Sequence, residues 1–414
     1  MQMILFEDDS TFTMRPLTFT RPLFHLRVGI DTISQKWERH LKQSVGAIAA
    51  GFLAPFFNQF VPTGNAVFIN GNFLPDAAFL EAISSLEPGD ALTSPDSKTL
   101  YAICGSAEEF SAIDFTQPVE DILGHCEALK TMKHHPVSVQ YPWDLFRLAN
   151  SILKRDFLEL TAGKVSCPIT DPHTIVYGKE NIFLEEGVKI RAAILNAENG
   201  PIYIGKNAEI QEGAIITGAH LIGEGATVNV GAKLRGDSVI GPYCKVGGEI
   251  SNSVLLGFSN KGHDGFLGNS VLGEWCNLGA DTNTSNLKNN YQNPKVYNYK
   301  AQGAIDCGTL FCGLIMGDHS KSGINTMFNT GTVVGVSCNI FGGDFPPTHV
   351  PSFSWGGGNQ YAEYIFAKAT DVMERVMKRR NKTLSEKDRQ LLESVFQFTA
   401  KDRARFLVNH RQNG

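Results

Sequence analysis

Residues 204–246 read IGKNAEIQEGAIITGAHLIGEGATVNVGAKLRGDSVIGPYCKV, and an aliphatic residue returns at every sixth position. The repeated residues are Ile204, Ile210, Ile216, Ile222, Val228, Leu234, Ile240 and Val246. Neither an α-helix nor a simple strand has this period. It is typical of a parallel β-helix of triangular section, in which each six-residue side points one aliphatic residue inward and three sides close a coil. The alternative is an irregular Gly- and Val-rich β-sandwich, but that fold rarely holds one period over so many units.

A second period supports the β-helix. Glycine recurs every eighteen residues, which is three hexads and one coil, at Gly187, Gly205, Gly223 and Gly241. The inward register continues at Leu272, Leu278, Met316, Phe328, Val334 and Ile340. We therefore expect a β-helix domain over residues 166–350. One polar excursion, Thr284–Gly303, interrupts it, and a loop of that length is typical of a functional element or of an arm that reaches a neighbouring subunit.

Composition excludes several classes of function. The 414 residues suffice for two or three domains, and 42% hydrophobic with 19% charged residues is ordinary for a globular protein. A net charge of −5 without a run of Lys or Arg gives no reason to expect nucleic acid as a partner. Neither a signal peptide nor a membrane span is expected, because no apolar run is long enough. The eight cysteines form no CxxC pair, so we expect several to be small buried residues in a cytoplasmic protein.

Residues 1–165 predict alternating strands and helices, and therefore a mostly parallel, Rossmann-like sheet with covered faces. The expected strands are Ile4–Phe6, Ala66–Ile69 and Tyr101–Cys104. The expected helices run from a cap at Asp31 to Gln43, over 77–86 after a cap at Asp76, and over 142–158. Ligands of such sheets bind at the carboxyl ends of strands, which is where Glu7–Asp9 and Asn70–Asn72 fall.

The last part of the chain predicts a helical extension over residues 351–414. Pro346–Pro347 and Gly356–Gly358 indicate the end of the β-helix. One helix is expected over Tyr361–Arg380, and another after Ser385, which opens a capping box. We expect these helices to cover an end of the β-helix or to pack on another chain, and the sequence assigns no chemistry to them.

Two collinear motifs lie in the β-helix. Ser259–Gly268 reads SNKGHDGFLG, and Asn277–Asn286 reads NLGADTNTSN. They resemble the SKAGHLTYLGD and NIGAGTITCN segments in the acyltransferase half of bacterial bifunctional N-acetylglucosamine-1-phosphate uridyltransferases. The resemblance implies that His263 is the general base that takes a proton from a sugar amine before the amine attacks acetyl-CoA. Imidazole suits this role because it titrates near neutrality, and backbone N–H groups of the coil could stabilise the oxyanion without an acyl-enzyme. Alternatively, a histidine flanked by glycines is a plain turn residue.

The same resemblance implies further site residues. Those expected to bind substrate are Lys261, Asn283, Asn286, Lys288 and Tyr291, and those expected to bind acyl-CoA are Ala280 and Lys321. Phe266 replaces a family tyrosine, which removes a substrate hydrogen bond, and residues 249–253 (EISNS) lack the family's phosphate-binding lysine. Lys288 and Lys295 could replace that charge, or they are solvated loop lysines. The corner segment Asp318–Lys321 has a structural alternative too, because corner histidines and asparagine ladders are common in β-helices.

A third motif lies near the N-terminus. Thr13–Leu23 reads TMRPLTFTRPL and resembles the activation loop TRMRPLTLTRPKPL of sugar-1-phosphate nucleotidyltransferases. The resemblance implies a nucleoside triphosphate substrate and Mg²⁺ as a candidate cofactor, with nucleotide-binding residues Arg15, Arg21, Asn70 and Asn72. Glu7–Asp9 replaces the Gly-rich turn that cradles phosphates in that family. Asn72 stands at the family's Mg²⁺-binding Asp, which weakens a metal site because Mg²⁺ prefers charged oxygens. The alternative is a structural arginine cluster that includes Arg27.

Overall, the chain is similar to uridyltransferase-like proteins that join a sugar-nucleotidyltransferase-like domain to a left-handed β-helix. The resemblance implies the left hand, a homotrimer and a role in cell-envelope biosynthesis. Three functions compete. The first is acyl-CoA-dependent acylation of an amino-sugar phosphate or nucleotide sugar. The second is sugar-1-phosphate nucleotidyl transfer (uridylyl or thymidylyl), with the β-helix as an oligomerisation scaffold. The third is a non-catalytic nucleotide-sugar-binding regulator. His263 and Asn286 favour the first function, and Asn72 counts against the second. Both halves lack residues that the resembling enzymes use, which keeps the third function as an alternative.

Overall fold

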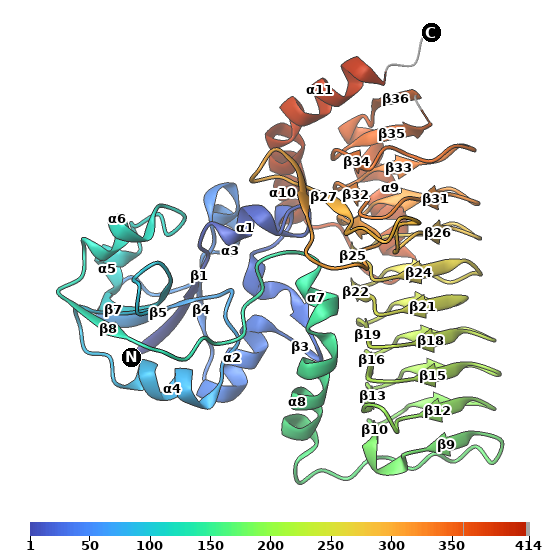
Figure 1. Cartoon of the computed structure of the whole chain (residues 1–414), viewed down its shortest axis with the longest axis horizontal. Coiled ribbons are helices and arrows are strands. Elements are labelled where there is room, and N and C mark those ends of the chain that lie inside the picture. Colours follow the sequence, from blue (N-terminus) through green and yellow to red (C-terminus); the bar gives the residue numbers. More distant parts are fainter. Residues whose placement is uncertain (359, 411–414) are drawn as a thin grey trace. The chain divides into compact units, whose positions relative to one another are not determined.

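The computed structural model describes residues 1–358 and 360–410 (Figure 1). It divides into two compact units, of which unit 1 is Met1–Leu26 with Asp31–Tyr141 and unit 2 is Arg27–Ile30 with Pro142–Gly414. Residue 165, where the sequence predicts a domain boundary, therefore falls within unit 2. Among the described residues, no helix is both long and apolar enough to cross a membrane.

Unit 1 is built on a six-stranded sheet with the strand order β4-β1-β5-β7-β6-β8. Its strands are β1 (Gln2–Phe6), β4 (Gly46–Ile48), β5 (Asn65–Asn70), β6 (Asp90–Thr93), β7 (Leu100–Ser106) and β8 (Ala128–Thr131). Its helices are α1 (Ser10–Thr13), α2 (Ile33–Leu41), α3 (Ala54–Phe57), α4 (Ala77–Ser84), α5 (Ala107–Phe110) and α6 (Val119–Leu123). The sheet is parallel as predicted, except that β7 is antiparallel to both of its neighbours. The reason is the short turn between β6 and β7, which allows only a hairpin.

The core of unit 1 is rich in aromatic side chains. Two of its helices begin at capping residues that are close in sequence to the backbone N–H groups they bind. Phe6 stacks on Phe115 with ring centroids 4.1 Å apart, and Phe68 packs against both Phe110 and Phe115. Asp76 caps α4 as predicted. The cap predicted at Asp31 is wrong by one residue. Thr32 caps α2 instead, because it exchanges reciprocal hydrogen bonds with Gln35 in a capping box.

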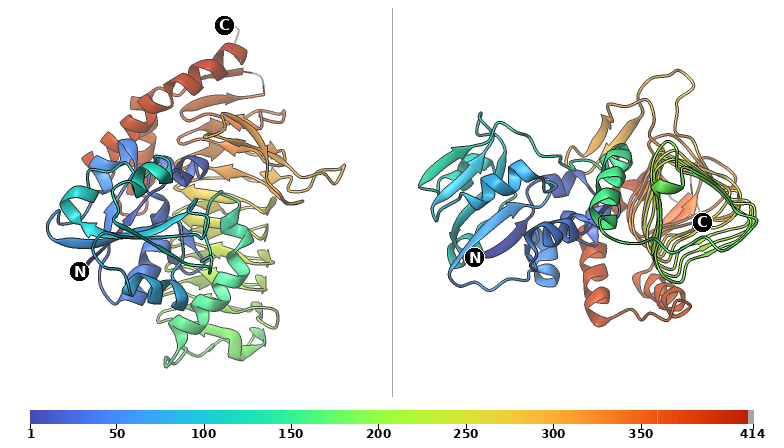
Figure 2. Two further views of the ribbon diagram at one scale, coloured as in Figure 1. Left: turned by 60° about the vertical axis from the view of Figure 1, so that its left-hand side comes forward. Right: turned by 90° about the horizontal axis from the view of Figure 1, so that it is seen from below.

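Unit 2 is a left-handed parallel β-helix with three faces, and its coils appear as nested triangles in the view from below (Figure 2). The first face contains β10 (Ile182–Leu184), β13 (Ile202–Ile204), β16 (His220–Ile222), β19 (Ser238–Ile240), β22 (Val254–Gly257), β25 (Val271–Glu274), β29 (Ile315–Met316), β32 (Val333–Val334) and β34 (His349–Val350). The second contains β11 (Lys189–Ile190), β14 (Glu209–Ile210), β17 (Thr227–Val228), β20 (Lys245–Val246), β23 (Asn260–Lys261), β30 (Lys321–Ser322) and β33 (Asn339–Ile340). The third contains β9 (Ile175–Tyr177), β12 (Ile194–Asn196), β15 (Ile215–Thr217), β18 (Lys233–Arg235), β21 (Glu249–Ser251), β24 (Phe266–Gly268), β26 (Asn283–Thr284) and β31 (Met327–Phe328). Helices α7 (Asp144–Arg147) and α8 (Ala149–Thr161) precede the β-helix, and α8 contacts β19.

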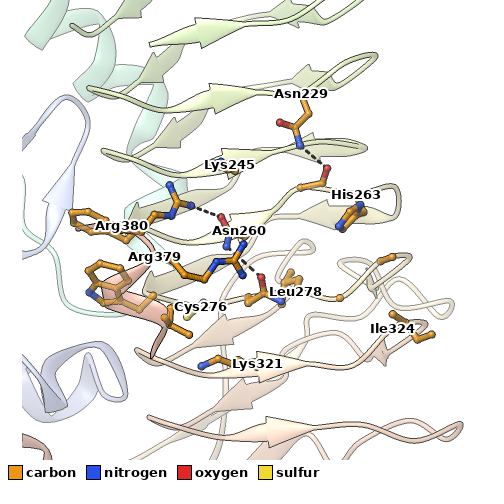
Figure 3. Close-up of a pocket in the computed structure, with 17 residues that line it drawn as sticks. Asn229, Lys245, Asn260, His263, Cys276, Leu278, Lys321, Ile324, Arg379 and Arg380 are labelled. Atoms are coloured by element: carbon orange, nitrogen blue, oxygen red, sulfur yellow. Dashed lines mark hydrogen bonds between the residues drawn. The ribbon is translucent and has the colours of Figure 1, made fainter. Parts of the chain in front are cut away.

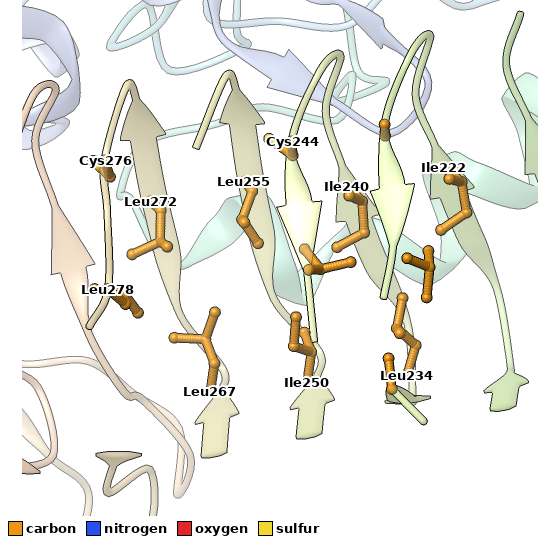
Figure 4. Close-up of a cluster of buried hydrophobic side chains, with 14 of the residues drawn as sticks. Ile222, Leu234, Ile240, Cys244, Ile250, Leu255, Leu267, Leu272, Cys276 and Leu278 are labelled. Carbon is orange, nitrogen blue, oxygen red and sulfur yellow. The ribbon is translucent and has the colours of Figure 1, made fainter. Parts of the chain in front are cut away.

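The hexad prediction is confirmed. All eight residues of the repeat, from Ile204 to Val246, are completely buried, and side chains from successive coils stack in the interior (Figure 4). The later inward positions are buried as well, and Cys244 and Cys276 belong to the same core. Burying each large aliphatic side chain contributes about 1.5–3 kcal/mol to stability. Because this burial is against side chains of the neighbouring coils, each coil is stable mainly through its neighbours.

The coil that leads into the histidine motif is shorter than those before it. Thr227 pairs with Lys245, eighteen residues on, but Lys245 pairs with Asn260, fifteen residues on. Gly247 permits the shortcut, because a Cβ there would lie only 2.4 Å from the carbonyl oxygen of Gly262. The period of eighteen therefore ends one coil before the motif.

The excursion from the coil is longer than predicted. It leaves after β26, includes an antiparallel hairpin of β27 (Lys295–Asn298) and β28 (Gly303–Asp306), and returns at β29. The hairpin is held against the coil by Tyr297, whose ring centroid lies 3.5 Å from that of His349. Hairpin pairing and this aromatic contact explain why the segment extends beyond Gly303.

Two C-terminal predictions need correction. The β-helix continues past Pro347, because β35 (Ser354–Gly357) pairs with β33 and then with β36 (Gln360–Glu363). Tyr361 lies in β36 and not in a helix, since its buried ring forms the last layer of the core. The helices are α9 (Phe366–Lys378), α10 (Glu386–Phe398) and α11 (Ala400–Asn409). The capping box at Ser385 is confirmed, and α11 covers the β-helix end through Phe406, whose ring centroid is 5.0 Å from that of Tyr361.

Candidate functional site

A polar column on the second face of the β-helix forms the floor of the candidate site. Outward-facing Lys245, Asn260, Asn277 and Lys321 are successive partners in the parallel register. The amide of Asn260 donates to Oδ1 of Asn277 over 3.3 Å. Because neighbouring strands lie about 4.8 Å apart, the column presents amides between two lysines along the β-helix axis.

An aromatic column lines one side of this floor. Ring centroids are 5.1 Å apart between Tyr243 and Phe258, 4.2 Å between Phe258 and Trp275, and 6.3 Å between Trp275 and His319. All four residues have φ between 53° and 62°, a left-handed conformation that costs free energy in residues with large side chains. Stacking and burial of the rings offset that cost. Phe258 and Trp275 line the cavity described below.

His263 lies at the opposite edge of the floor, in the turn that joins β23 to β24. Its side chain is exposed, and Gly279, Ala280 and Ile324 from the following coils lie along the same edge. The turn is fixed in part by Asn229, whose amide donates to the carbonyl oxygen of Gly262 over 2.7 Å. A rigid coil corner thus presents the imidazole to the floor.

The end of α9 and the residues after it form a roof over the floor. Nη2 of Arg380 donates to Oδ1 of Asn260 over 2.9 Å, and Nη1 donates to the carbonyl oxygen of Tyr243 over 3.3 Å. Partial burial lowers the pKa of Arg380 below its usual value. Val376 and Arg379 complete the roof. Sequence reasoning missed this contribution, and the only local signal was the adjacent Arg379 and Arg380 at the end of an amphipathic helix.

Floor, aromatic column, histidine edge and roof line an open cavity of about 690 Å³ (Figure 3). Four lysines and arginines line it: Lys245, Lys321, Arg379 and Arg380. None of the described residues that line it is Asp or Glu. Burial lowers the pKa of Lys321, whose ammonium donates to the carbonyl oxygen of His319 over 2.9 Å. This charge distribution favours an anionic ligand, because nothing in the lining repels one.

The predicted site residues of the β-helix, apart from Lys261, fall into two groups. His263, Ala280 and Lys321 line this cavity. Asn283, Asn286, Lys288 and Tyr291 lie elsewhere: Asn283 accepts from the backbone N–H of Phe266, Asn286 donates to Asn269, Lys288 lines a second cavity of about 420 Å³ with Lys295, and Tyr291 is exposed.

Lys261 takes an unexpected place. It occupies an inward position beside Val246, and its side chain is 1% exposed. Its ammonium donates to the carbonyl oxygens of Gly247, His263 and Asp264, and burial lowers its pKa to about 8. It is not among the residues that line the cavity.

In unit 1, the ends of β1 and β5 come together as predicted. The side-chain amides of Asn70 and Asn72 donate to Oδ2 of Asp8 over 2.8 and 3.1 Å, while Oδ1 of Asp8 accepts from the backbone N–H of Ser10 over 2.9 Å. Among the described residues there is no cluster of three His, Cys, Asp or Glu that could hold a metal ion. These residues do not fit a tightly bound Mg²⁺, because amide N–H groups already occupy the carboxylate.

The other candidate nucleotide-binding residues of unit 1 are largely embedded. Arg15 lies over the ring of Phe12 at 4.7 Å, and Arg21 is buried. Glu7 is also buried, and its carboxylate accepts from the backbone N–H groups of Leu23 and Ala50 over 2.7 and 2.8 Å. Burial raises the pKa of Glu7 to about 7. These contacts support a structural role for the segment that follows β1.

Comparison with known proteins bears first on unit 1. Residues 3–165 match the family model of sugar nucleotidyl transferases. The N-terminal part of the chain is therefore similar to that family, whereas the cavity lies in unit 2 and outside the matched residues. No curated protein matches the sequence significantly.

Two solved structures are similar to part of the chain. The polySia-specific acetyltransferase NeuO is 16% identical, with a TM-score of 0.24, over 46% of this chain and 84% of that chain. The Arabidopsis UDP-N-acetylglucosamine acyltransferase is 13% identical, with a TM-score of 0.24, over 57% of this chain and 94% of that chain.

Proposed function

We propose that unit 2 is an acyl-CoA-dependent acyltransferase that acylates the amine of an amino-sugar phosphate or a nucleotide amino-sugar, with His263 as general base. The observation that carries the proposal is the position of His263 at the rim of a 690 Å³ cavity lined by four lysines and arginines. An imidazole at this position can accept the proton of a substrate amine. A cavity with cations and without acidic residues can bind substrates that carry phosphates.

The reaction requires one proton acceptor and one oxyanion site. His263 takes the proton from the amine as its nitrogen attacks the thioester carbonyl. The C–N bond forms, the C–S bond breaks, and the thiolate of CoA receives the proton from the imidazolium. Backbone N–H groups on the rigid coil are the candidate donors to the oxyanion of the tetrahedral intermediate. No covalent acyl-enzyme is required.

The lysines and arginines would bind the phosphates of the two substrates. Residues 249–253 carry no lysine, and in this proposal Arg379 and Arg380 supply positive charge from the segment directly after α9 instead. In this proposal Lys321, on the floor, pairs with a phosphate of acyl-CoA. The guanidinium groups of Arg379 and Arg380 suit phosphate binding because a guanidinium can bind phosphate through two parallel N–H groups.

The test is thiol release from acetyl-CoA and longer acyl-CoAs, measured with a panel of amino-sugar phosphates and nucleotide amino-sugars. Wild type is compared with His263→Ala and with His173→Ala, a control at an exposed histidine of the same β-helix. We expect release with one class of acceptor, loss of at least about a hundredfold in His263→Ala, and no change in the control. Folded wild-type protein that releases no thiol with any acceptor contradicts the proposal.

A second candidate function concerns unit 1, because the sugar nucleotidyl transferase model matches residues 3–165. The reaction would be uridylyl or thymidylyl transfer to a sugar 1-phosphate, with Arg15 and Arg21 near the triphosphate. Calorimetric titration of the full chain with UTP or dTTP, with and without Mg²⁺, and an assay of pyrophosphate release with added sugar 1-phosphates test this function. Mg²⁺-dependent binding with pyrophosphate release supports it, whereas binding without turnover favours the non-catalytic regulator.

A further inference from the structure

Lys261 is a charged residue at a position that the β-helix otherwise fills with apolar side chains. On the second face its inward neighbours are Val246, one coil before, and Leu278, one coil after, and both are buried. An ammonium in such a core loses its hydration, a cost that an aliphatic side chain of similar volume would not have. The lysine is therefore not explained by the stability of the stack alone.

The partners of Lys261 show where its hydrogen bonds are used. The ammonium lies 2.5 Å from the carbonyl oxygen of His263, 3.1 Å from that of Asp264 and 3.3 Å from that of Gly247. Two of these three carbonyls belong to the turn that carries the imidazole. Carbonyl groups that bind an ammonium form charge-assisted hydrogen bonds, which are stronger than neutral ones.

Every carbonyl group of the turn has a donor within unit 2. That of Gly262 accepts from Asn229, and that of His263 accepts from Lys261. The carbonyl of Asp264 accepts from Lys261 and from the backbone N–H of Asp281, and that of Gly265 accepts from the backbone N–H of Glu249. Lys261 is the only side chain in this set that reaches the turn from inside the coil, and it holds the two central residues.

We propose that Lys261 is a positioning residue, which fixes the turn 262–265 from inside the β-helix and so holds the imidazole of His263 in one orientation at the cavity rim. This role deepens the proposed acyl transfer and rests on it for its catalytic consequence. It differs from the substrate-binding role that the motif implies, because the ammonium contacts backbone carbonyls and does not line the cavity.

The test uses the full chain with three variants. Lys261→Met replaces the ammonium by an apolar group of similar length, and Lys261→Gln keeps a neutral donor. Leu255→Met is the matched control, since Leu255 is an inward residue of the first face and is also completely buried. Each variant is measured for thermal midpoint, hydrogen exchange at the amides of Glu249 and Asp281, the imidazole NMR signal of His263, and kcat and KM for thiol release.

We expect Lys261→Met to change the thermal midpoint little, because removal of the desolvated ammonium offsets the loss of its hydrogen bonds, while exchange at the two amides accelerates about tenfold or more. The His263 signal should broaden or split, and kcat should fall with KM unchanged. Lys261→Gln should lie between Met and wild type, and Leu255→Met should match wild type in exchange and kcat. This pattern separates positioning from a purely structural role, in which stability and activity fall together.

The thermal midpoint, the exchange rates and the His263 signal do not depend on activity. If wild type releases no thiol, the proposed function fails, and the exchange rates and the His263 signal still decide whether Lys261 fixes the turn. Unchanged exchange and an unchanged His263 signal in Lys261→Met overturn the proposal. Loss of folding in both Lys261 variants also overturns it, because it assigns the residue to the stability of the coil.

Discussion

His220 sets an acid limit on the stability of unit 2. It is completely buried, and burial lowers its pKa to about 4. In the unfolded chain a histidine has a pKa of about 6.5, so it becomes protonated at pH values at which His220 of the folded chain stays neutral. Stability from this source is therefore complete above about pH 6.5 and is lost as the pH falls toward 4, at up to about 1.4 kcal/mol per pH unit.

Urea unfolding at several pH values between 7.5 and 4.5 measures this loss. We expect His220→Gln to show a shallower decline of the unfolding free energy than wild type, and the exposed-site variant His173→Gln to show the wild-type slope. Equal slopes in all three proteins would contradict the assignment of the acid limit to His220.

Among the cavity residues, Arg380 is the one whose removal should weaken substrate binding most. Its guanidinium contacts the floor through Asn260 and the aromatic column through the backbone of Tyr243. Removing a charged donor to a phosphate costs about 1.5–3 kcal/mol, so we expect Arg380→Ala to raise KM for the phosphate-bearing substrate about tenfold or more. The wild-type KM should also rise with salt, because ions screen the cationic cavity.

The control for this prediction is Arg375→Ala, an exposed residue one turn earlier in α9 that does not line the cavity. Its KM and salt dependence should equal those of wild type. A similar KM change in both variants would mean that net charge, and not contact with the ligand, is responsible.

At the scale of elements, the aromatic column is a source of stability that is held in an unfavourable backbone conformation. Trp275→Gly relieves the backbone cost at φ 62° but removes the ring that stacks on Phe258. Truncating a buried aromatic costs about 3–5 kcal/mol, whereas the relief is about 1 kcal/mol. We expect a net loss of about 2–4 kcal/mol in urea unfolding and a weaker near-UV circular dichroism signal. A neutral or stabilising effect would show that the stacking does not offset the strain.

The elements differ in how far the sequence predicts them. The hexads predict the β-helix because each inward side chain packs only on its neighbours, so a local pattern is sufficient from Ile204 to Val246. The position of α9 over the second face has no comparable local signal, since Arg380 and Asn260, which form a hydrogen bond, are 120 residues apart in the chain. Of the cavity lining, His263, Ala280 and Lys321 were therefore predictable from the sequence, and the roof was not. Lys261 was predicted as a site residue, but its inward direction follows from the shortened coil.

At the scale of the whole molecule, the chain combines a unit similar to sugar nucleotidyl transferases with a β-helix that contains the candidate acyl-transfer cavity. In unit 1, Asn72 donates to both Asp8 and Ser10 over 3.1 Å. Asn72→Asp would place a second carboxylate against Asp8. The two like charges should lower the thermal midpoint of unit 1 in EDTA, and added Mg²⁺ should restore it, because a pair of carboxylates is a suitable ligand set for that ion.

Thermal unfolding with EDTA and with Mg²⁺ measures this response, and Asn72→Ala is the matched control, since it loses the same hydrogen bonds without gaining a charge. We expect Mg²⁺ to shift only Asn72→Asp, and thiol release to be the same in all three proteins. An equal Mg²⁺ shift in wild type would show that the amide-bound carboxylate already accepts the ion, and nucleotidyl transfer would then become the better proposal for unit 1. A change in thiol release would instead show that the two units are coupled, because none of these substitutions alters a residue of the cavity.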